Sequence, residues 1–160
     1  GRRLVITRFV EGYKEYRNNQ DLQDVEFANT VLKNAAFELG KMHGVGVSHG
    51  HPHNRNILVN NKGDVILIDP KFMKKTNREP EMPLPQLFRH KQVILQHFVK
   101  SERRKGELHD LAYFLELTTQ MPLETMQHAE FITKEQLGAT YRKGVSYAKK
   151  TAKQTRKKEN

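Results

Sequence analysis

The feature that most constrains the fold is a pair of short apolar segments near the middle of the chain. Residues 57–59 and 65–68 have the length and apolar content of buried strands. Between them, residues 60–63 read Asn-Asn-Lys-Gly, a combination that favours a tight turn. We therefore predict a β-hairpin at this position.

Polar residues stand at the open end of this hairpin. Asn56 directly precedes the first strand, and Asp69 directly follows the second. Because strand pairing holds the two ends together, we expect the amide oxygen of Asn56 and the carboxylate of Asp69 to face one point. Oxygen ligands suit a hard cation such as Mg²⁺, which keeps further positions open for substrate phosphates. The sequence therefore predicts a metal site here.

The remainder of the chain is mostly helical in pattern. Apolar residues recur at three- and four-residue steps from about 19 to 43, which predicts an amphipathic helix that ends before Gly44. Residues 4–9 are rich in β-branched side chains and predict a strand. Further helices are predicted over residues 86–100, 107–119, 123–131 and 134–157, the last with Thr133 and Gln136 as a capping box. The expected fold is α+β, dominated by helix, in a single domain of 160 residues.

The composition narrows the function classes. The chain has no cysteine, which excludes disulfides and thiolate metal sites. It has no apolar run long enough to span a membrane and no visible leader, so we expect a cytoplasmic protein.

The net charge is +10, and eight basic residues lie between Arg142 and Lys158. Such a basic tail can bind nucleic acid or another anionic partner. Because no aromatic platform accompanies it, the interpretation that we favour is a solvated helix end.

The segment around the hairpin resembles a known family. Residues 49–59 read His-Gly-His-Pro-His-Asn-Arg-Asn-Ile-Leu-Val, and residues 65–69 read Val-Ile-Leu-Ile-Asp. Together they resemble the catalytic and metal-binding loops of the protein-kinase-like superfamily, closest to bacterial small-molecule and lipopolysaccharide kinases. The resemblance covers roughly residues 4–120 and implies the C-terminal lobe of that fold. It implies that Asn56 and Asp69 bind Mg²⁺ beside ATP and take part in catalysis.

The same resemblance implies a nucleotide site. Residues 5–12 resemble the strand and hinge of the family, so backbone groups of Arg8 and Val10 are expected to meet adenine. Leu58 and Ile68 are expected to form the apolar floor.

The domain then divides into a hinge strand (1–12), a lobe core (13–137) and a basic C-terminal helix or tail (138–160). The N-terminal lobe, with its glycine-rich loop and lysine, is expected to lie outside these residues or to come from a partner; otherwise nucleotide binding is weak.

Position 51 departs from the family, because His51 stands where the catalytic aspartate is expected. A neutral imidazole can act as a base near neutral pH, but it brings a charge of zero or +1 where the family has −1. Two functions therefore stay open. The first is an ATP- and Mg²⁺-dependent phosphotransferase acting on a hydroxyl of a protein, sugar or small molecule. The second is a pseudokinase-like module that binds nucleotide, nucleic acid or an acidic partner.

Two further alternatives concern single motifs. His49, His51 and His53 alternate along the chain and could bind zinc, although the residues that follow depart from the zinc-hydrolase motif with a similar beginning. Asp110 is expected to anchor the catalytic loop from a buried helix, or else to cap a helix over residues 111–119.

Overall fold

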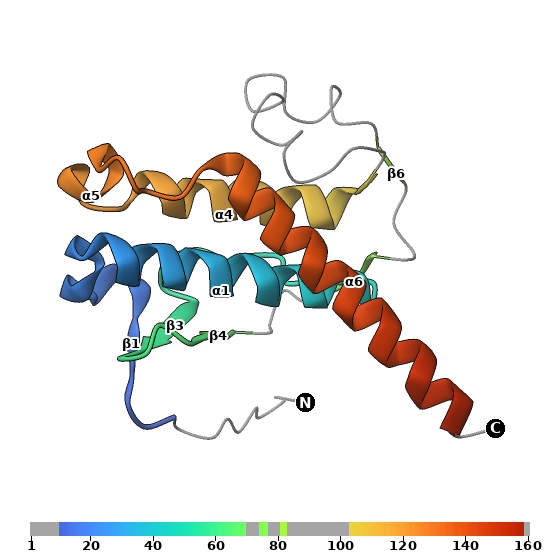
Figure 1. The fold of residues 1–160 in the computed structure, drawn as a ribbon. Helices are drawn as coiled ribbons and strands as arrows, with labels where there is room; N and C mark the ends of the chain where they lie inside the picture. The colour runs from blue at the N-terminus through green and yellow to red at the C-terminus, as the bar shows by residue number, and fades with distance from the viewer. Residues whose placement is uncertain (1–9, 70–73, 77–80, 83–102, 159–160) are drawn as a thin grey trace, which may run out of the picture.

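In the described residues, the fold consists mainly of four α-helices and a small antiparallel sheet. The structure is a computed structural model, and it describes residues 10–69, 74–76, 81–82 and 103–158. The α-helices are α1 (Val25–Gly44), α4 (Lys105–Thr119), α5 (Leu123–Gln127) and α6 (Lys134–Lys158) (Figure 1). The predicted α+β class with helix predominating is confirmed. The strand predicted at 4–9 and the helix predicted at 86–100 lie outside the described residues.

The predicted hairpin is present. Strand β3 (Ile57–Asn60) pairs antiparallel with β4 (Val65–Leu67), and Ile57 lies opposite Leu67. The turn is closed by Asn60, whose Oδ1 accepts hydrogen bonds from the backbone N–H groups of residues 62 and 64, at 2.9 and 2.8 Å. Gly63 has a φ of 82°, a conformation that glycine adopts without a steric penalty.

A third strand, which the sequence did not predict, completes the sheet. Strand β1 (Tyr13–Glu15) pairs antiparallel with β3, so the strand order is β1-β3-β4. Its three residues are too few to show a periodic pattern. Two shorter pairs join β2 (Val47–Ser48) to β5 (Lys74–Lys75) and β6 (Glu81–Met82) to β7 (Arg103–Arg104).

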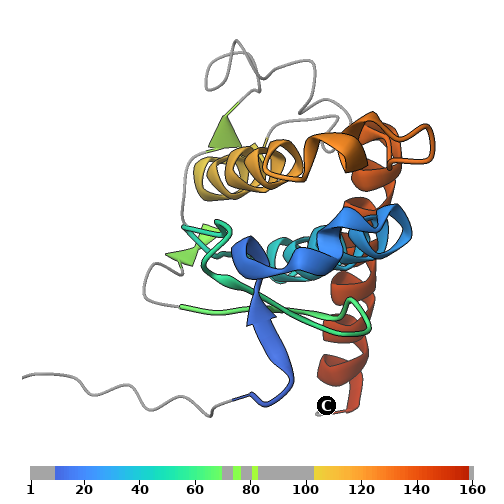
Figure 2. The same ribbon diagram turned by 90° about the vertical axis from the view of Figure 1, so that its left-hand side faces the viewer.

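Helix α1 is the centre of the fold, between the sheet and α4 (Figures 1 and 2). Its predicted start is too early: the 3-10 turns η1 (Tyr16–Asn18) and η2 (Gln20–Gln23) come first. The α-helix begins after Asp24, whose carboxylate accepts a 2.7 Å hydrogen bond from the N–H of Phe27. Its apolar stripe is part of one buried core with Ile57, Val59 and Val65 of the sheet and with the buried apolar residues of α4.

Helix α6 crosses α1 at a very close approach. A Cβ added at Gly144 would collide with the carbonyl oxygen of Phe37, and one at Gly40 would collide with the carbonyl oxygen of Tyr141. The two backbones can therefore touch only because these positions lack side chains. The predicted capping box is confirmed at the start of α6, where Thr133 and Gln136 exchange side-chain to backbone hydrogen bonds.

Beyond this crossing, α6 continues past the body of the fold (Figure 1). Residues 149–158 are all exposed except for the half-buried Ala152. Within the described parts of the chain, no helix combines the length and the apolar character that a membrane span requires.

Candidate active site around the histidine loop

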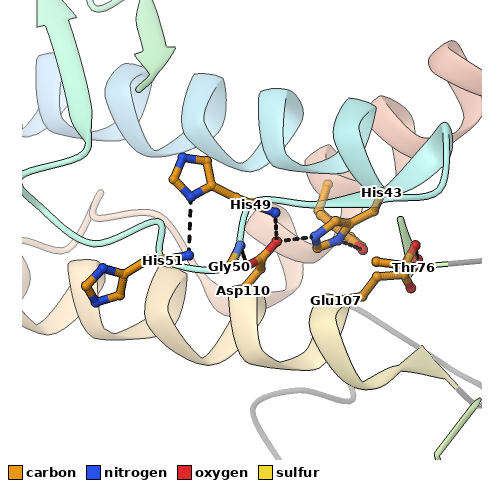
Figure 3. A network of polar contacts seen from close by, with 8 residues as sticks. His43, His49, Gly50, His51, Thr76, Glu107 and Asp110 are labelled. Carbon is orange, nitrogen blue, oxygen red and sulfur yellow. Dashed lines mark hydrogen bonds and ion pairs between the residues drawn. The ribbon is translucent and has the colours of Figure 1, made fainter. Parts of the chain in front are cut away.

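Residues 49–56, called the histidine loop below, run from β2 to β3 over the middle of α4. Their backbone is held by one carboxylate, that of Asp110, which is fully buried. Its Oδ2 accepts the N–H of His49 at 2.6 Å, and its Oδ1 accepts the N–H of Gly50 at 2.7 Å (Figure 3). The expectation that Asp110 anchors this loop is confirmed. The alternative helix cap is wrong, because α4 begins at Lys105 and Asp110 lies inside it.

The same carboxylate is tied to α1 and α6. The Nε2 atom of His43, near the end of α1, lies 2.8 Å from Oδ2 of Asp110. The Nδ1 atom of His43 lies 2.7 Å from the hydroxyl of Tyr141 on α6. A carboxylate accepts hydrogen bonds, so Nε2 carries the donating proton, and in the neutral ring Nδ1 accepts from the tyrosine. Three helices thus meet in one buried polar chain.

The side chain of His49 fastens the loop to the end of the hairpin. Its Nε2 lies 2.8 Å from the carbonyl oxygen of Ile68, which can only accept. The proton is therefore on Nε2, and the unprotonated Nδ1 accepts the N–H of His51 at 3.3 Å. Both ring nitrogens are used in these contacts, so His49 has a structural role. The residue after its partner Ile68 is Asp69.

The hairpin register brings Asn56 and Asp69 to the same end of the sheet, as predicted. The backbone N–H of Ile68 donates to the carbonyl of Asn56 at 2.9 Å, which extends the β3–β4 pairing by one step. The buried Asn56 donates its Nδ2 to the carbonyl of His51 at 3.0 Å. This bond directs the amide nitrogen toward the loop and turns Oδ1 away from it.

Asp69 has an unusual backbone conformation. Its φ is 63°, and within the described ranges it is the only residue other than glycine with a positive φ. Aspartate tolerates this left-handed region better than most residues, although it still costs free energy. Strain of this kind persists where the surrounding structure holds it, often at functional sites. The side chain is exposed and so is accessible to a ligand.

His51 lies among other rings at the position where the resemblance implies an aspartate. Its imidazole packs edge-on against Tyr113 of α4, with the ring centroids 4.9 Å apart, and against His53 at 4.1 Å. The pKa of His53 is lowered from 6.5, first by partial burial and then by repulsion from His51. A positive charge on His51 therefore disfavours a second one on His53.

The residues expected to bind nucleotide are only partly described. Arg8 lies outside the described residues, and Val10 is half-buried just ahead of β1. Leu58 and Ile68 are half-buried at the hairpin. Because β3 alternates between buried and half-buried residues, Leu58 faces away from α1, on the same face as its cross-strand partner Ile66.

The side chains at the hairpin end, those of Asn56 and Asp69, carry oxygen atoms and not the nitrogen or sulfur ligands that zinc sites commonly use. Among the residues that the structure describes, no group of three or more His, Asp or Glu side chains converges on one point. The zinc interpretation of the three histidines therefore has no support in the described fold. An amide oxygen from Asn56 and a carboxylate from Asp69 are hard ligands of the type that suit Mg²⁺, which commonly takes only one or two protein ligands together with phosphates and water.

Sequence reasoning missed three residues around this site. Ile66 could have been found from the hairpin register, which places it opposite Leu58. Tyr113 and Tyr141 could not, because only the packing of α4 and α6 brings them to His51 and His43.

Comparison with known proteins leaves the family open. No protein-family model matches the chain, and no curated protein or solved structure is significantly similar to it.

Proposed function

We propose that this chain is the C-terminal lobe of a kinase-like phosphotransferase that uses ATP and Mg²⁺. Its acceptor is a hydroxyl of a protein, sugar or small molecule. The observation that carries the proposal is the carboxylate of Asp110, which holds the N–H groups of His49 and Gly50 at 2.6 and 2.7 Å. A loop immobilised in this way presents the next residue, His51, at a constant position. Phosphoryl transfer relies mainly on positioning and electrostatic stabilisation, so a rigid loop is a functional requirement.

The hairpin supplies the second part of the argument. Asn56 and Asp69 lie at its open end, and the bond from Asn56 to His51 orients the amide. In the proposed function these two residues hold Mg²⁺, which neutralises the negative charge of the phosphates. Leu58 and Ile68, with Ile66 beside them, provide apolar surface for adenine, and backbone groups of Arg8 and Val10 meet its edge.

His51 has the role of the acceptor-facing residue in this proposal. An imidazole near neutral pH can take up the proton of the attacking hydroxyl. Its contacts with Tyr113 and His53 restrict the ring.

The same ring contacts favour a second candidate function. His51 contacts the rings of Tyr113 and His53, and its imidazole cannot carry the negative charge of an aspartate. The chain would then bind Mg-ATP without transferring phosphate, as a pseudokinase-like module.

Two measurements on the full-length protein test the proposal. The first is thermal unfolding with and without Mg-ATP at about millimolar concentration, where a ligand at about 100 times its Kd adds about 2.7 kcal/mol of stability. The second is transfer from ATP labelled on the γ-phosphate. We expect stabilisation that Asp69→Ala removes, and transfer that the same variant abolishes. Asp21→Ala, which changes an exposed aspartate of η2, is the control and should alter neither result.

The outcomes separate the two candidates. Transfer that Asp69→Ala abolishes supports the enzyme. Stabilisation without transfer, together with a large gain of transfer in His51→Asp, supports the nucleotide-binding module. Absence of any stabilisation by Mg-ATP contradicts both.

A further inference from the structure

A second feature lies away from the histidine loop, along the flank of α6. Here an open groove of about 500 Å³ runs between α6 and the side of α1. Its lining includes Phe37 from α1 and Lys143, Tyr147 and Lys150 from α6. The groove therefore combines aromatic rings with cationic side chains.

The aromatic part of the groove is accessible to a ligand. Tyr147 is 55% exposed. Its centroid lies 5.8 Å from that of Phe37, with the rings inclined at 50°. Phe37 holds one side of the tyrosine ring in place and leaves part of it open to solvent. A ring that is restrained and exposed costs little conformational entropy when a planar group stacks on it.

The cationic part continues along the helix. Lys143, Lys150 and Lys157 are spaced by seven residues, which places them on one face of α6 about 10 Å apart. No acidic residue occurs between positions 138 and 158. Residues 149–158, which carry Lys150 and Lys157, project beyond the body of the fold and are exposed except for the half-buried Ala152 (Figure 1).

We infer that this groove and the stripe of lysines beyond it bind single-stranded nucleic acid. Proteins that bind single strands without strong sequence preference combine a positive groove with aromatic side chains on which bases stack. The stripe contacts the phosphates, and Tyr147 stacks on a base. A membrane surface fits less well, because residues 149–158 contain no large apolar side chain to insert. An acidic protein would use the lysines but would leave the exposed ring without a function.

This inference changes the interpretation of the basic tail. The sequence favoured a solvated helix end because no aromatic platform accompanied the charges. The platform exists, but half of it is Phe37, which reaches α6 only through the close crossing of α1 and α6. The inference does not depend on ATP binding.

Fluorescence anisotropy of the full-length protein with a labelled single-stranded oligonucleotide of mixed sequence tests it. Tyr147→Ala should weaken binding about 5- to 150-fold, the loss expected for one stacked base, whereas Tyr147→Phe should retain affinity. The double variant Lys143→Ala/Lys150→Ala should reduce the slope of log K against log salt by about 1.4, or about 0.7 for each lost phosphate contact. The double variant Lys14→Ala/Lys62→Ala removes the same charge from strand β1 and from the hairpin turn, and it should leave the slope unchanged.

The remaining outcomes are also decisive. Thermal unfolding of Tyr147→Ala should match that of the parent protein, which shows that any loss of affinity is local. If Tyr147→Ala binds as tightly as Tyr147→Phe, the stacking site is wrong. Binding of a duplex, polyglutamate or anionic vesicles at least as tightly as the single strand would also overturn the proposal. If the parent protein does not bind the oligonucleotide although Mg-ATP stabilises it, this inference alone is contradicted.

Discussion

The histidine loop and the crossing of α1 with α6 are positioned by opposite means. The loop is held by an added group, the carboxylate of Asp110, which satisfies two consecutive backbone donors and a histidine. The crossing depends on the absence of two side chains, because Gly40 and Gly144 allow the backbones of α1 and α6 to come into contact. We therefore expect removal of the Asp110 carboxylate to destabilise the loop, and addition of a side chain at Gly40 or Gly144 to destabilise the crossing.

The two regions are also connected. Tyr141 belongs to the crossing, where its carbonyl approaches Gly40, and its hydroxyl reaches His43, which reaches Asp110. The position of α6 is thus linked to the position of the histidine loop. The predictions below separate the two regions or test their connection.

The largest effect is expected for Asp110→Ala. The change leaves the N–H groups of His49 and Gly50 and one nitrogen of His43 without their partner in a buried site. Removing one member of a buried charged network typically costs about 3–5 kcal/mol of unfolding free energy. Urea denaturation measures it, with Lys105→Ala at the exposed start of α4 as the control. A loss below about 1 kcal/mol would show that the loop is held by other contacts.

Gly144→Ala breaks the crossing instead of the loop. In an unobstructed helix this change would stabilise the protein by about 0.5–1 kcal/mol, because alanine favours helix. Here the new methyl group meets the carbonyl of Phe37, so we expect destabilisation of about 1–3 kcal/mol.

Urea denaturation measures the unfolding free energy of Gly144→Ala. A decrease supports the close crossing of α1 and α6, and an increase contradicts it. Gln154→Ala, on the exposed part of α6, should stay within about 0.5 kcal/mol of the parent protein.

Tyr141→Phe tests the connection between the two regions. It removes only the hydroxyl that contacts Nδ1 of His43, and one such hydrogen bond contributes about 0.5–1.5 kcal/mol.

A double-mutant cycle with Asp110→Ala should give a coupling energy of at least about 0.5 kcal/mol if the chain acts as a unit. Additive losses would mean that the two contacts are independent. Tyr147→Phe, a tyrosine outside this chain, serves as the matched control.

The smallest expected effect is a pH dependence from His53. Its pKa in the folded protein is lowered from 6.5, through partial burial and the neighbouring His51, so the unfolded chain binds a proton more readily. Stability should therefore fall as the pH drops below about 6.5, and this contribution should vanish above that value.

His53→Gln should reduce the difference in unfolding free energy between about pH 5.5 and about pH 7.5, as measured by urea denaturation. If His53→Gln shows the same difference in unfolding free energy between the two pH values as the parent protein, the assignment to His53 is contradicted.

Local sequence signals predicted the elements that depend on local interactions. The hairpin follows from two apolar runs and the turn residues around Asn60, and its register then places Asn56 and Asp69 together. The C-terminal boundary of α1 near Gly44 and the capping box of α6 were also correct. The start of α1 was misplaced, because Asp24 competes with earlier residues of similar capping ability.

The candidate site was predictable only in part. Asn56, Asp69 and Asp110 could be placed by pattern, but the ring contacts of His51 and the left-handed conformation of Asp69 could not. Both depend on how α4 and the hairpin fit together.

The sequence by itself determined the hairpin, the basic character of α6 and most of the described helices, because each depends on residues close together in the chain. The helix predicted over residues 123–131 is too long, since α5 ends at Gln127. Tertiary structure alone decided that Tyr141 would reach His43 and that Phe37 would lie beside Tyr147. The physical reason is the glycine contact between α1 and α6. Glycines far apart in the chain set the closeness of two helices only when both are present in one packed body, and no local pattern records that distance.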